Sequence, residues 1–180
     1  DYQKQYILRF ADGIHAVDPS AWILLTPPSV NFYPPNLGSG YEGELVYKPH
    51  WYDDVHWITK AYHFIPNAFL GNDKLTNKPV IGLPVKVQAS FNDQMRRIKQ
   101  IGNEWQGGVP TLIGEIGICY DMNNREAYRT GNYNAHVAEW DRLFKALDAS
   151  MLNYNLWTYN AYNDNEYGDH WDLEDFSIYS

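Results

Sequence analysis

The sequence predicts an α/β fold in which parallel strands alternate with helices. Two helical patterns are well defined, because apolar residues recur every three or four positions over residues 85–105 and 137–151. Short apolar runs, of which 21–26 and 111–117 are the clearest, have the length and composition of buried strands. Strands that alternate with helices form βαβ units in a parallel sheet. Four such units in 180 residues would make half of a (β/α)8 barrel.

In the first part of the chain we expect an amphipathic helix, whose apolar positions are Tyr6, Ile7, Phe10, Ile14 and Val17. A strand buried on both faces is expected at 21–26, followed by a loop rich in proline and glycine at 27–40. A second strand at 44–52 leads into a short helix at 53–62 and a long loop at 64–84.

In the second part, the helix at 85–105 should bury one apolar face, formed by Val87, Phe91, Met95, Ile98, Ile101 and Trp105. A strand is expected at 111–117 and a polar loop at 121–131. The next helix should bury Val137, Trp140, Phe144, Leu147 and Met151. The last strand is expected at 155–160, before a polar and aromatic tail.

Composition excludes several classes of protein. The net charge of -8 argues against binding nucleic acid, which calls for clustered Lys and Arg. No apolar stretch approaches the roughly 20 residues that a membrane span needs. The single cysteine, Cys119, excludes an intrachain disulfide, and the sequence has no Asn-x-Ser/Thr glycosylation site. Both features slightly favour an intracellular compartment. The chain opens at Asp1 without a methionine, so we expect a piece of a longer protein.

Polar and aromatic residues gather where the predicted strands end. Glu115 is a lone carboxylate at the end of an apolar run, and buried carboxylates are rare unless they are paired or used. The neighbouring strand ends carry His50, Tyr52 and Trp157. In a (β/α)8 barrel these ends converge on the active site. Trp157 would stack on a sugar ring, Tyr52 would donate to Glu115, His50 would bind a hydroxyl, and Glu115 would attack an anomeric carbon.

These residues carry a resemblance to a known family. The segments "PHWY", "IGEIG" and "LWTYN", in this order, resemble glycoside hydrolase family 5, and the tail "NDNEYGDHWDLEDFSIYS" resembles fungal endoglycoceramidase-related enzymes of the glucosylceramidase and steryl-β-glucosidase type. The resemblance covers nearly the whole chain and implies a TIM barrel, of which residues 1–180 supply strands five to eight. It implies a retaining hydrolase in which Glu115 is the nucleophile and His50, Tyr52 and Trp157 bind the substrate. The implied substrate is glucosylceramide or a steryl glucoside.

One part of the family pattern is missing. The family takes its acid/base from the Glu of an Asn-Glu-Pro on the fourth strand, and this chain has no Asn-Glu-Pro. We therefore expect the chain alone to be inactive and to need the N-terminal half of the barrel as its partner. Exposed apolar strand faces and open sheet edges should then favour association. Two carboxylates suffice for the chemistry, so no cofactor is required.

Several other residues admit more than one interpretation. Glu166 and Asp169 in the tail are candidates for binding glucose hydroxyls. The pairs Asp53–Asp54 and His50–His56 would suit a metal, although the two acids fit better as the start of a helix. A partial match to a calcium loop, at Asn163, Asn165, Gly168 and Glu174, lacks an acid at its first position and flanking helices. We expect no metal site, and we interpret Cys119 as a packing residue.

Two rival functions remain open on the sequence. A β-glucanase or β-mannanase of the same fold would need a long open cleft. A carbohydrate-binding module would use the same aromatic residues, but such modules are commonly β-sandwiches and the two strong helical patterns oppose that fold.

Overall fold

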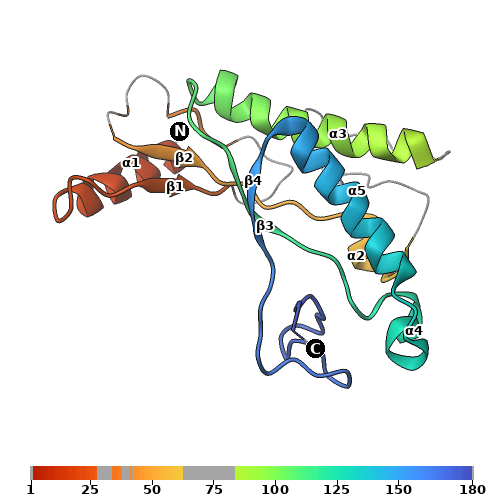
Figure 1. Cartoon of the computed structure of the whole chain (residues 1–180). Helices are drawn as coiled ribbons and strands as arrows, with labels where there is room; N and C mark the ends of the chain where they lie inside the picture. The colour runs from red at the N-terminus through yellow and green to blue at the C-terminus, as the bar shows by residue number, and fades with distance from the viewer. Residues whose placement is uncertain (1, 28–33, 38–40, 42, 63–83, 180) are drawn as a thin grey trace.

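A computed structural model of the chain (Figure 1) describes residues 2–27, 34–37, 41, 43–62 and 84–179. Most of the loop predicted at 64–84 therefore lies outside the described residues, as does part of the loop at 27–40. The elements follow in the order α1 (Tyr2–His15), β1 (Ile23–Leu25), β2 (Leu45–Tyr47), α2 (Asp54–Thr59), α3 (Pro84–Gln100), a π-helical turn η2 (Ile101–Trp105), β3 (Leu112–Ile116), α4 (Met122–Thr130), α5 (Asn134–Ser150) and β4 (Asn153–Leu156).

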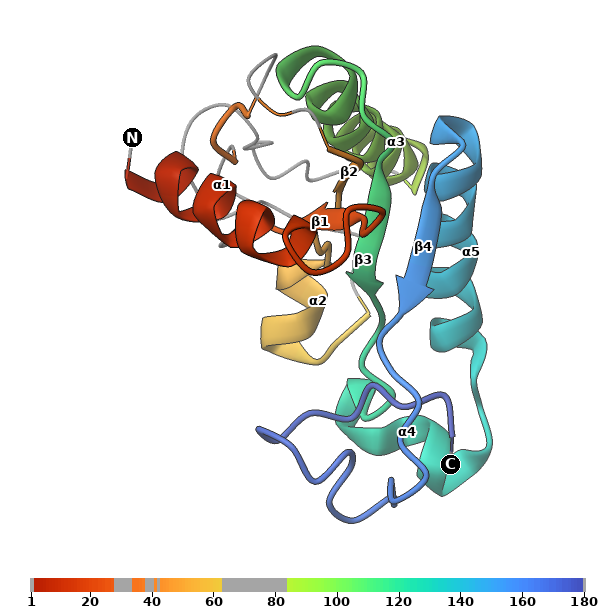
Figure 2. The same ribbon diagram turned by 90° about the vertical axis from the view of Figure 1, so that its left-hand side faces the viewer.

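The described strands are parallel, as predicted. β1 pairs with β2, and β3 pairs with β4. Two isolated parallel bridges, Tyr47 to Thr111 and His50 to Glu115, connect β2 with β3. The strands are therefore neighbours in chain order, as successive βα units require. Figure 2 shows β3 and β4 pointing toward α4 and the C-terminal tail, which lie beyond the carboxyl ends of these strands.

The main core lies between the strands and the helices α3 and α5, which pack against each other (Figure 1). The apolar face predicted for α3 is confirmed for Val87, Phe91, Met95, Ile98 and Ile101, which are all buried. Trp105 departs from this face: it is 42% exposed, and its indole N–H donates to the carbonyl of Pro34 at 2.8 Å. No helix in the described part of the chain has the length and apolar character needed to span a bilayer.

The buried face of α5 differs from the prediction. Val137 and Met151 are 65% and 80% exposed, whereas Leu143 and Ala146 are buried. The buried face also carries Glu139 and Arg142, which form an ion pair at 3.1 Å. An apolar pattern cannot anticipate this face, because two opposite charges enter the interior only when they compensate each other.

The segment at 121–131, predicted as a polar loop, contains α4. Asn123, Asn124 and Arg125 have positive φ values of 52–58°, and regular helix follows them. Gly131 ends α4 with a left-handed φ of 72°, and its N–H bonds to the carbonyl of Ala127. Asparagine tolerates positive φ better than most residues. The helix buries Met122 and Ala127, two apolar residues that the polar composition concealed.

The two outer strands are less buried than predicted. Leu24 in β1 is 46% exposed, although Ile23 and Leu25 pack against α1, so β1 is not buried on both faces. All four residues of β4 are exposed. Each strand pairs with one neighbour in the described chain, which leaves its other edge unpaired there. β4 also starts two residues earlier than predicted and ends at Leu156, which leaves Trp157 just past its carboxyl end.

Candidate functional site at the strand ends

Glu115 lies in β3, where two side chains from the β2 side contact one of its oxygens. The Tyr52 hydroxyl donates to Glu115 Oε2 at 3.0 Å, and His50 Nδ1 lies 3.1 Å from the same oxygen. The backbone sets this arrangement, because the Trp51 N–H donates to the Glu115 carbonyl at 2.9 Å and His50 bridges Glu115 directly. Among the described residues, Glu115 Oε1 receives no such contact, and the side chain is 27% exposed. The carboxylate is thus fixed through one oxygen and accessible at the other.

The pKa shifts of both partners of Glu115 favour their neutral forms. Burial lowers the pKa of His50 and outweighs the opposite effect of the Glu115 charge, while Lys48 lowers it further. A neutral imidazole that donates from Nδ1 fits this contact better than an ion pair. Burial also raises the pKa of Tyr52 far above its usual value, and the charge of Glu115 adds to the shift. Hydrogen bonds to a carboxylate favour its charged form.

The two glycines that flank Glu115 have steric roles. A Cβ at Gly114 would lie 2.8 Å from Lys48 Cγ and 2.9 Å from His50 Cδ2. A Cβ at Gly117 would lie 2.2 Å from the carbonyl oxygen of Trp157. Gly114 therefore lets the side chains of the β2 segment cross the strand, and Gly117 lets the backbone after β4 approach β3.

Trp157 belongs to the same region of the molecule. Its N–H donates to the carbonyl of Ile116 at 2.9 Å, which extends the pairing of β3 with β4 by one residue. Its indole N–H points to Oε2 of Glu174, 3.4 Å away. Tyr52 contacts the tail as well, because its ring meets Phe176 edge-on with 5.6 Å between the ring centroids. The structure thus brings His50, Tyr52 and Glu115 into direct contact and joins Trp157 to them through the strands and the tail.

The two tail residues predicted to bind glucose differ in their surroundings. Asp169 is buried, and its carboxylate accepts from the Asn163 side chain at 3.0 Å and from the Phe176 N–H at 2.7 Å. Asp169 therefore holds the tail together, and its binding of glucose hydroxyls stays a prediction. Glu166 is exposed, and its carbonyl accepts from Arg125 at 3.1 Å. No contact of Glu166 with Glu115, Tyr52 or Trp157 occurs among the described residues, and its role stays a prediction.

Glu174 is the site residue that the sequence reasoning missed. Its only sequence signal was the last position of the partial calcium loop, but the structure places it against Trp157. Burial raises the pKa of this carboxyl, and the charges of Asp172, Asp169 and Glu115 act in the same direction. Glu174 is thus a second carboxylate in the neighbourhood of Glu115.

Structural roles explain three of the residues considered for metal binding or nucleophilic attack, namely Asp53, His56 and Cys119. Asp53 caps α2 by accepting from the N–H groups of Val55 and His56. The His56 ring accepts from the Cys119 N–H at 3.0 Å. Cys119 is buried, and burial raises the pKa of its thiol, which disfavours a reactive thiolate. Across the described ranges, no group of three or more His, Cys, Asp or Glu residues is arranged to hold a metal ion.

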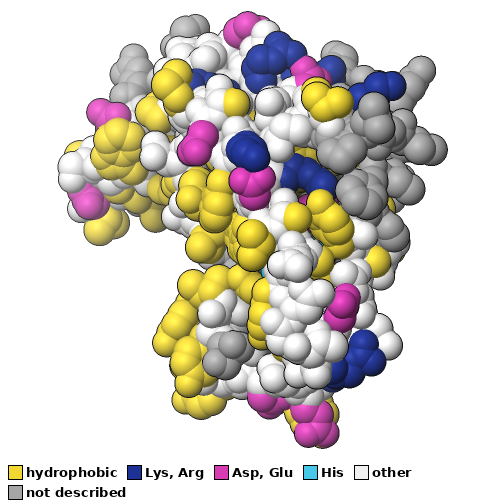
Figure 3. Space-filling model, turned by 45° about the vertical axis from the view of Figure 1, so that its right-hand side comes forward, with side chains coloured by type: hydrophobic (Ala, Val, Ile, Leu, Met, Phe, Trp, Pro, Cys, Tyr) yellow, Lys and Arg dark blue, Asp and Glu magenta, His cyan; other side chains and the backbone are white. Residues whose placement is uncertain are grey.

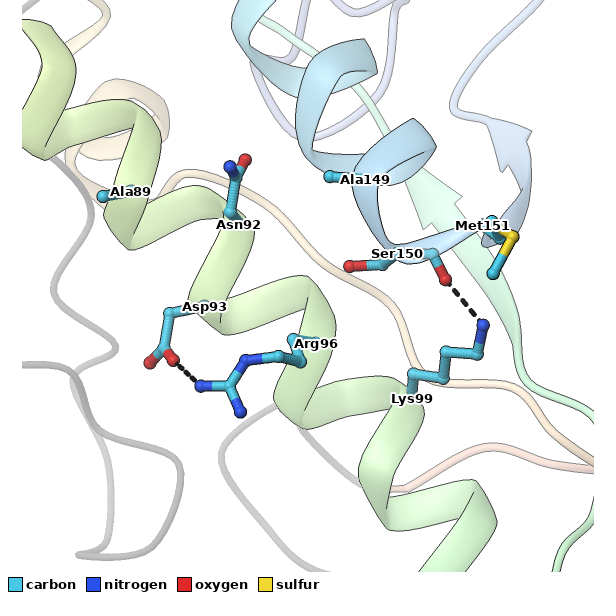
Figure 4. Close-up of a pocket in the computed structure, with 8 residues that line it drawn as sticks. All are labelled: Ala89, Asn92, Asp93, Arg96, Lys99, Ala149, Ser150 and Met151. Atoms are coloured by element: carbon cyan, nitrogen blue, oxygen red, sulfur yellow. Dashed lines mark hydrogen bonds and ion pairs between the residues drawn. The ribbon is translucent and has the colours of Figure 1, made fainter.

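A separate cavity of about 450 Å³ lies between α3 and the end of α5 (Figure 4). Arg96 pairs with Asp93 there, and Lys99 donates to the Ser150 carbonyl at 2.7 Å. Both cations are thus engaged, and the lining contains none of the strand-end residues. This cavity is distinct from the candidate site.

Parallel strands with a Glu held by Tyr and His at their carboxyl ends define an α/β protein whose candidate site lies where barrel enzymes carry theirs. The chain is 28% identical over its full length to the glucosylceramidase of Rhizopus delemar, and 31% identical over 99% of its length to that of Aspergillus fumigatus. It is 31% identical over 91% of its length to the ergosteryl-β-glucosidase of Saccharomyces cerevisiae. A crystal structure of Cryptococcus neoformans sterylglucosidase 1 superposes on 98% of the chain with a TM-score of 0.86 and 28% identity.

The chain is therefore homologous to fungal glucosylceramidases and steryl-β-glucosidases. It spans about a quarter of the length of these relatives: 27% of the Rhizopus protein, 24% of the Aspergillus protein, 22% of the Saccharomyces protein and 26% of the Cryptococcus chain. No family model matches the sequence.

Proposed function

We propose that residues 1–180 are the second half of a (β/α)8 domain in a retaining β-glycosidase, with Glu115 as the nucleophile. The observation that carries this proposal is the asymmetric environment of Glu115. Tyr52 and His50 both contact Oε2, and Oε1 stays accessible. A nucleophile needs this combination, because it must be held in place while one oxygen can reach the reacting carbon.

In the proposed reaction, Glu115 Oε1 attacks the anomeric carbon and a glycosyl ester forms as the bond to the leaving oxygen breaks. The leaving oxygen takes a proton from a second carboxyl group, the acid/base that we propose lies in the preceding βα units. Water then attacks the anomeric carbon, gives up its proton to that second group, and releases Glu115. Tyr52 and His50 stabilise the Glu115 carboxylate before attack and after its release.

An apolar surface supports the idea that further βα units cover this chain. α1 and β1 line a groove of about 440 Å³ whose walls are mostly apolar. Tyr6, Phe10, Trp22 and Leu24 in this groove are 63%, 57%, 54% and 46% exposed. Figure 3 shows exposed hydrophobic side chains gathered along one side of the molecule. Exposed apolar patches commonly mark surfaces that another part of a protein covers. The units preceding β1, with the acid/base, are the proposed occupants.

The proposed substrate is a β-glucoside with a lipid aglycone. This part of the proposal rests on the relatives, which include a glucosylceramidase and an ergosteryl-β-glucosidase. It would fail if the complete enzyme hydrolysed cellobiose as fast as glucosylceramide.

A mechanism-based trap tests the nucleophile. The complete enzyme is incubated with a 2-fluoro-glucoside that carries an activated leaving group, and the labelled protein is mapped by peptide mass spectrometry. We expect one glycosyl adduct on the peptide that carries Glu115. The variant Glu115→Gln should take up no label and lose at least about 10⁴-fold in kcat. Labelling of another carboxylate, or a folded Glu115→Gln enzyme with more than about 1% of wild-type kcat, would refute the assignment.

The isolated 180-residue chain provides a second test. We expect no turnover of an unactivated glucoside, because the chain lacks the acid that protonates the leaving oxygen. Measurable turnover would mean that another carboxyl group of this chain supplies the proton.

A further inference from the structure

Glu174 presents its carboxylate beside the proposed sugar platform, and no described cation pairs with it. Its Oε2 faces the Trp157 indole N–H at 3.4 Å, which is a long hydrogen bond. Among the described residues, no Lys, Arg or His forms a salt bridge with Glu174. The charges that act on it are further acids, Asp172, Asp169 and Glu115. The long bond to Trp157 alone does not compensate for this environment.

The backbone around Glu174 is held firmly. The Glu174 N–H donates to the Trp171 carbonyl at 2.8 Å, and its carbonyl accepts from the Asp169 N–H at 2.8 Å. The preceding carbonyl, of Leu173, accepts from Lys60 Nζ at 2.8 Å, and Lys60 is itself anchored to Asp121. The tail is therefore fixed to the C-terminal end of α2 next to Glu174. Backbone bonds on both sides position the side chain before any ligand arrives, as a binding residue requires.

The position of the Glu174 carboxylate also favours a role in binding a ligand. Glu174 lies near the indole of Trp157, and its charge acts on both Glu115 and Tyr52. A sugar stacked on Trp157 with its anomeric carbon at Glu115 would bring other hydroxyls toward Glu174. Hydroxyls are the donors that this carboxylate lacks, and a charged acceptor forms stronger bonds with them than a neutral one.

Resting on the proposed function, we propose that Glu174 binds one or two hydroxyl groups of the sugar ring, beside Trp157 and away from the bond that is cleaved. Its chemical target is a neutral pyranose whose ring hydroxyls donate to the carboxylate. Glu174 would in this way contribute to the choice among sugars, while Glu115 performs the covalent step.

The test compares Glu174→Gln with the wild type in the complete enzyme, on aryl β-glucoside and on its 3-, 4- and 6-deoxy analogues. Glutamine keeps the size of the side chain and an oxygen that accepts from Trp157. We expect kcat/KM on the parent glucoside to fall about 10- to 100-fold, as for loss of a hydrogen bond to a charged group. On the deoxy analogue that lacks the bound hydroxyl, the same substitution should cost less than about threefold.

The matched control is Asp172→Asn, an exposed position two residues away. It removes the same charge, and asparagine accepts the positive φ of 45° found there. We expect less than about a twofold change in kcat/KM, as for a surface substitution. The comparison among substrates within one variant does not depend on how much of the enzyme is folded.

The outcomes separate the two proposals. An equal loss on every deoxy analogue would mean that Glu174 acts through Trp157 or the fold, and would overturn the inference. A loss no larger than that of Asp172→Asn would overturn it as well. If the wild-type enzyme cleaves no glucoside and takes no label from the 2-fluoro-glucoside, the proposed function itself fails. If the wild-type enzyme is labelled and Glu174→Gln keeps the wild-type kcat/KM, only the proposed role of Glu174 is refuted.

Discussion

Glu115 and Glu139 are two carboxylates in one small α/β chain, and their surroundings are opposite. Glu115 lies at a strand end, is 27% exposed, and accepts from two neutral donors, Tyr52 and His50. Glu139 lies on α5, is 1% exposed, and pairs with Arg142. The first is held by hydrogen bonds and open to a ligand, whereas the second is enclosed with an opposite charge.

The difference shows that the surroundings of a carboxylate decide whether it serves packing or ligand binding. Arg142 also stacks on the rings of Tyr62 and Phe91, at 5.1 and 5.4 Å from their centroids, so the Glu139 cluster belongs to the packing of the helices. Burial, aided by the charge of Asp53, raises the pKa of Glu139 from 4.5 to about 8. Removing a side-chain contact to Glu115 should therefore alter activity with little effect on folding. Changes at Glu139 should alter folding with little effect on activity.

After the change at Glu115 itself, the largest expected effect comes from Tyr52→Phe. This change removes the hydroxyl that donates to Glu115 and keeps the ring that packs against Phe176. We expect kcat/KM of the complete enzyme to fall roughly 10- to 100-fold, because a charged group loses a donor. Steady-state kinetics would measure the effect on activity, and thermal melting would measure the effect on stability. Wild-type kinetics in this variant would show that Glu115 does not depend on Tyr52.

Gly117→Ala addresses the contact between β3 and β4. The new Cβ would lie 2.2 Å from the Trp157 carbonyl, so the backbone after β4 must shift. We expect a loss of about 1–3 kcal/mol in the free energy of unfolding, together with reduced kcat/KM. The control is Gly13→Ala in α1, where nothing lies within 4 Å of the new Cβ. That change should stabilise the protein by about 0.5–1 kcal/mol. Equal stabilities of the two variants in urea unfolding would contradict the close approach.

The smallest effect on activity is expected from Glu139→Gln. This substitution should instead change the pH dependence of the free energy of unfolding. Because the pKa of Glu139 is raised in the folded state, its stabilising contribution is complete below about pH 4.5 and is lost as the pH rises through about 8. Glutamine does not titrate, so the variant should lose less stability than the wild type between pH 5 and pH 8. Urea unfolding at several pH values measures this slope.

The control for this prediction is Asp141→Asn, on the exposed side of the same helix. Asp141 is 57% exposed and pairs with Lys145. We expect its pH slope to match that of the wild type, because exposed pairs contribute little to stability. If Glu139→Gln kept the wild-type slope too, another group would be titrating in this range.

The sequence alone determined the parallel α/β arrangement and the centre of the candidate site. Helical spacing marked α3 through Val87, Phe91 and Met95, because an apolar face repeats every three or four residues and needs no partner to be recognised. The lone carboxylate between two glycines marked Glu115, because an acid in an apolar strand demands an explanation. The segment around His50 and Tyr52 pointed to its neighbours, and the homologous fungal enzymes agree with the family that these motifs indicated.

Only the tertiary structure decided which residues around that centre face the site. Asp169 and Glu174 are both acids in the same polar tail, but backbone bonds draw the first inward and leave the second beside Trp157. The buried face of α5 likewise depended on the pairing of Glu139 with Arg142. Long-range pairing and steric contact decide these details. A local sequence pattern cannot predict these contacts, because the partners lie far apart in the chain and meet only after it folds.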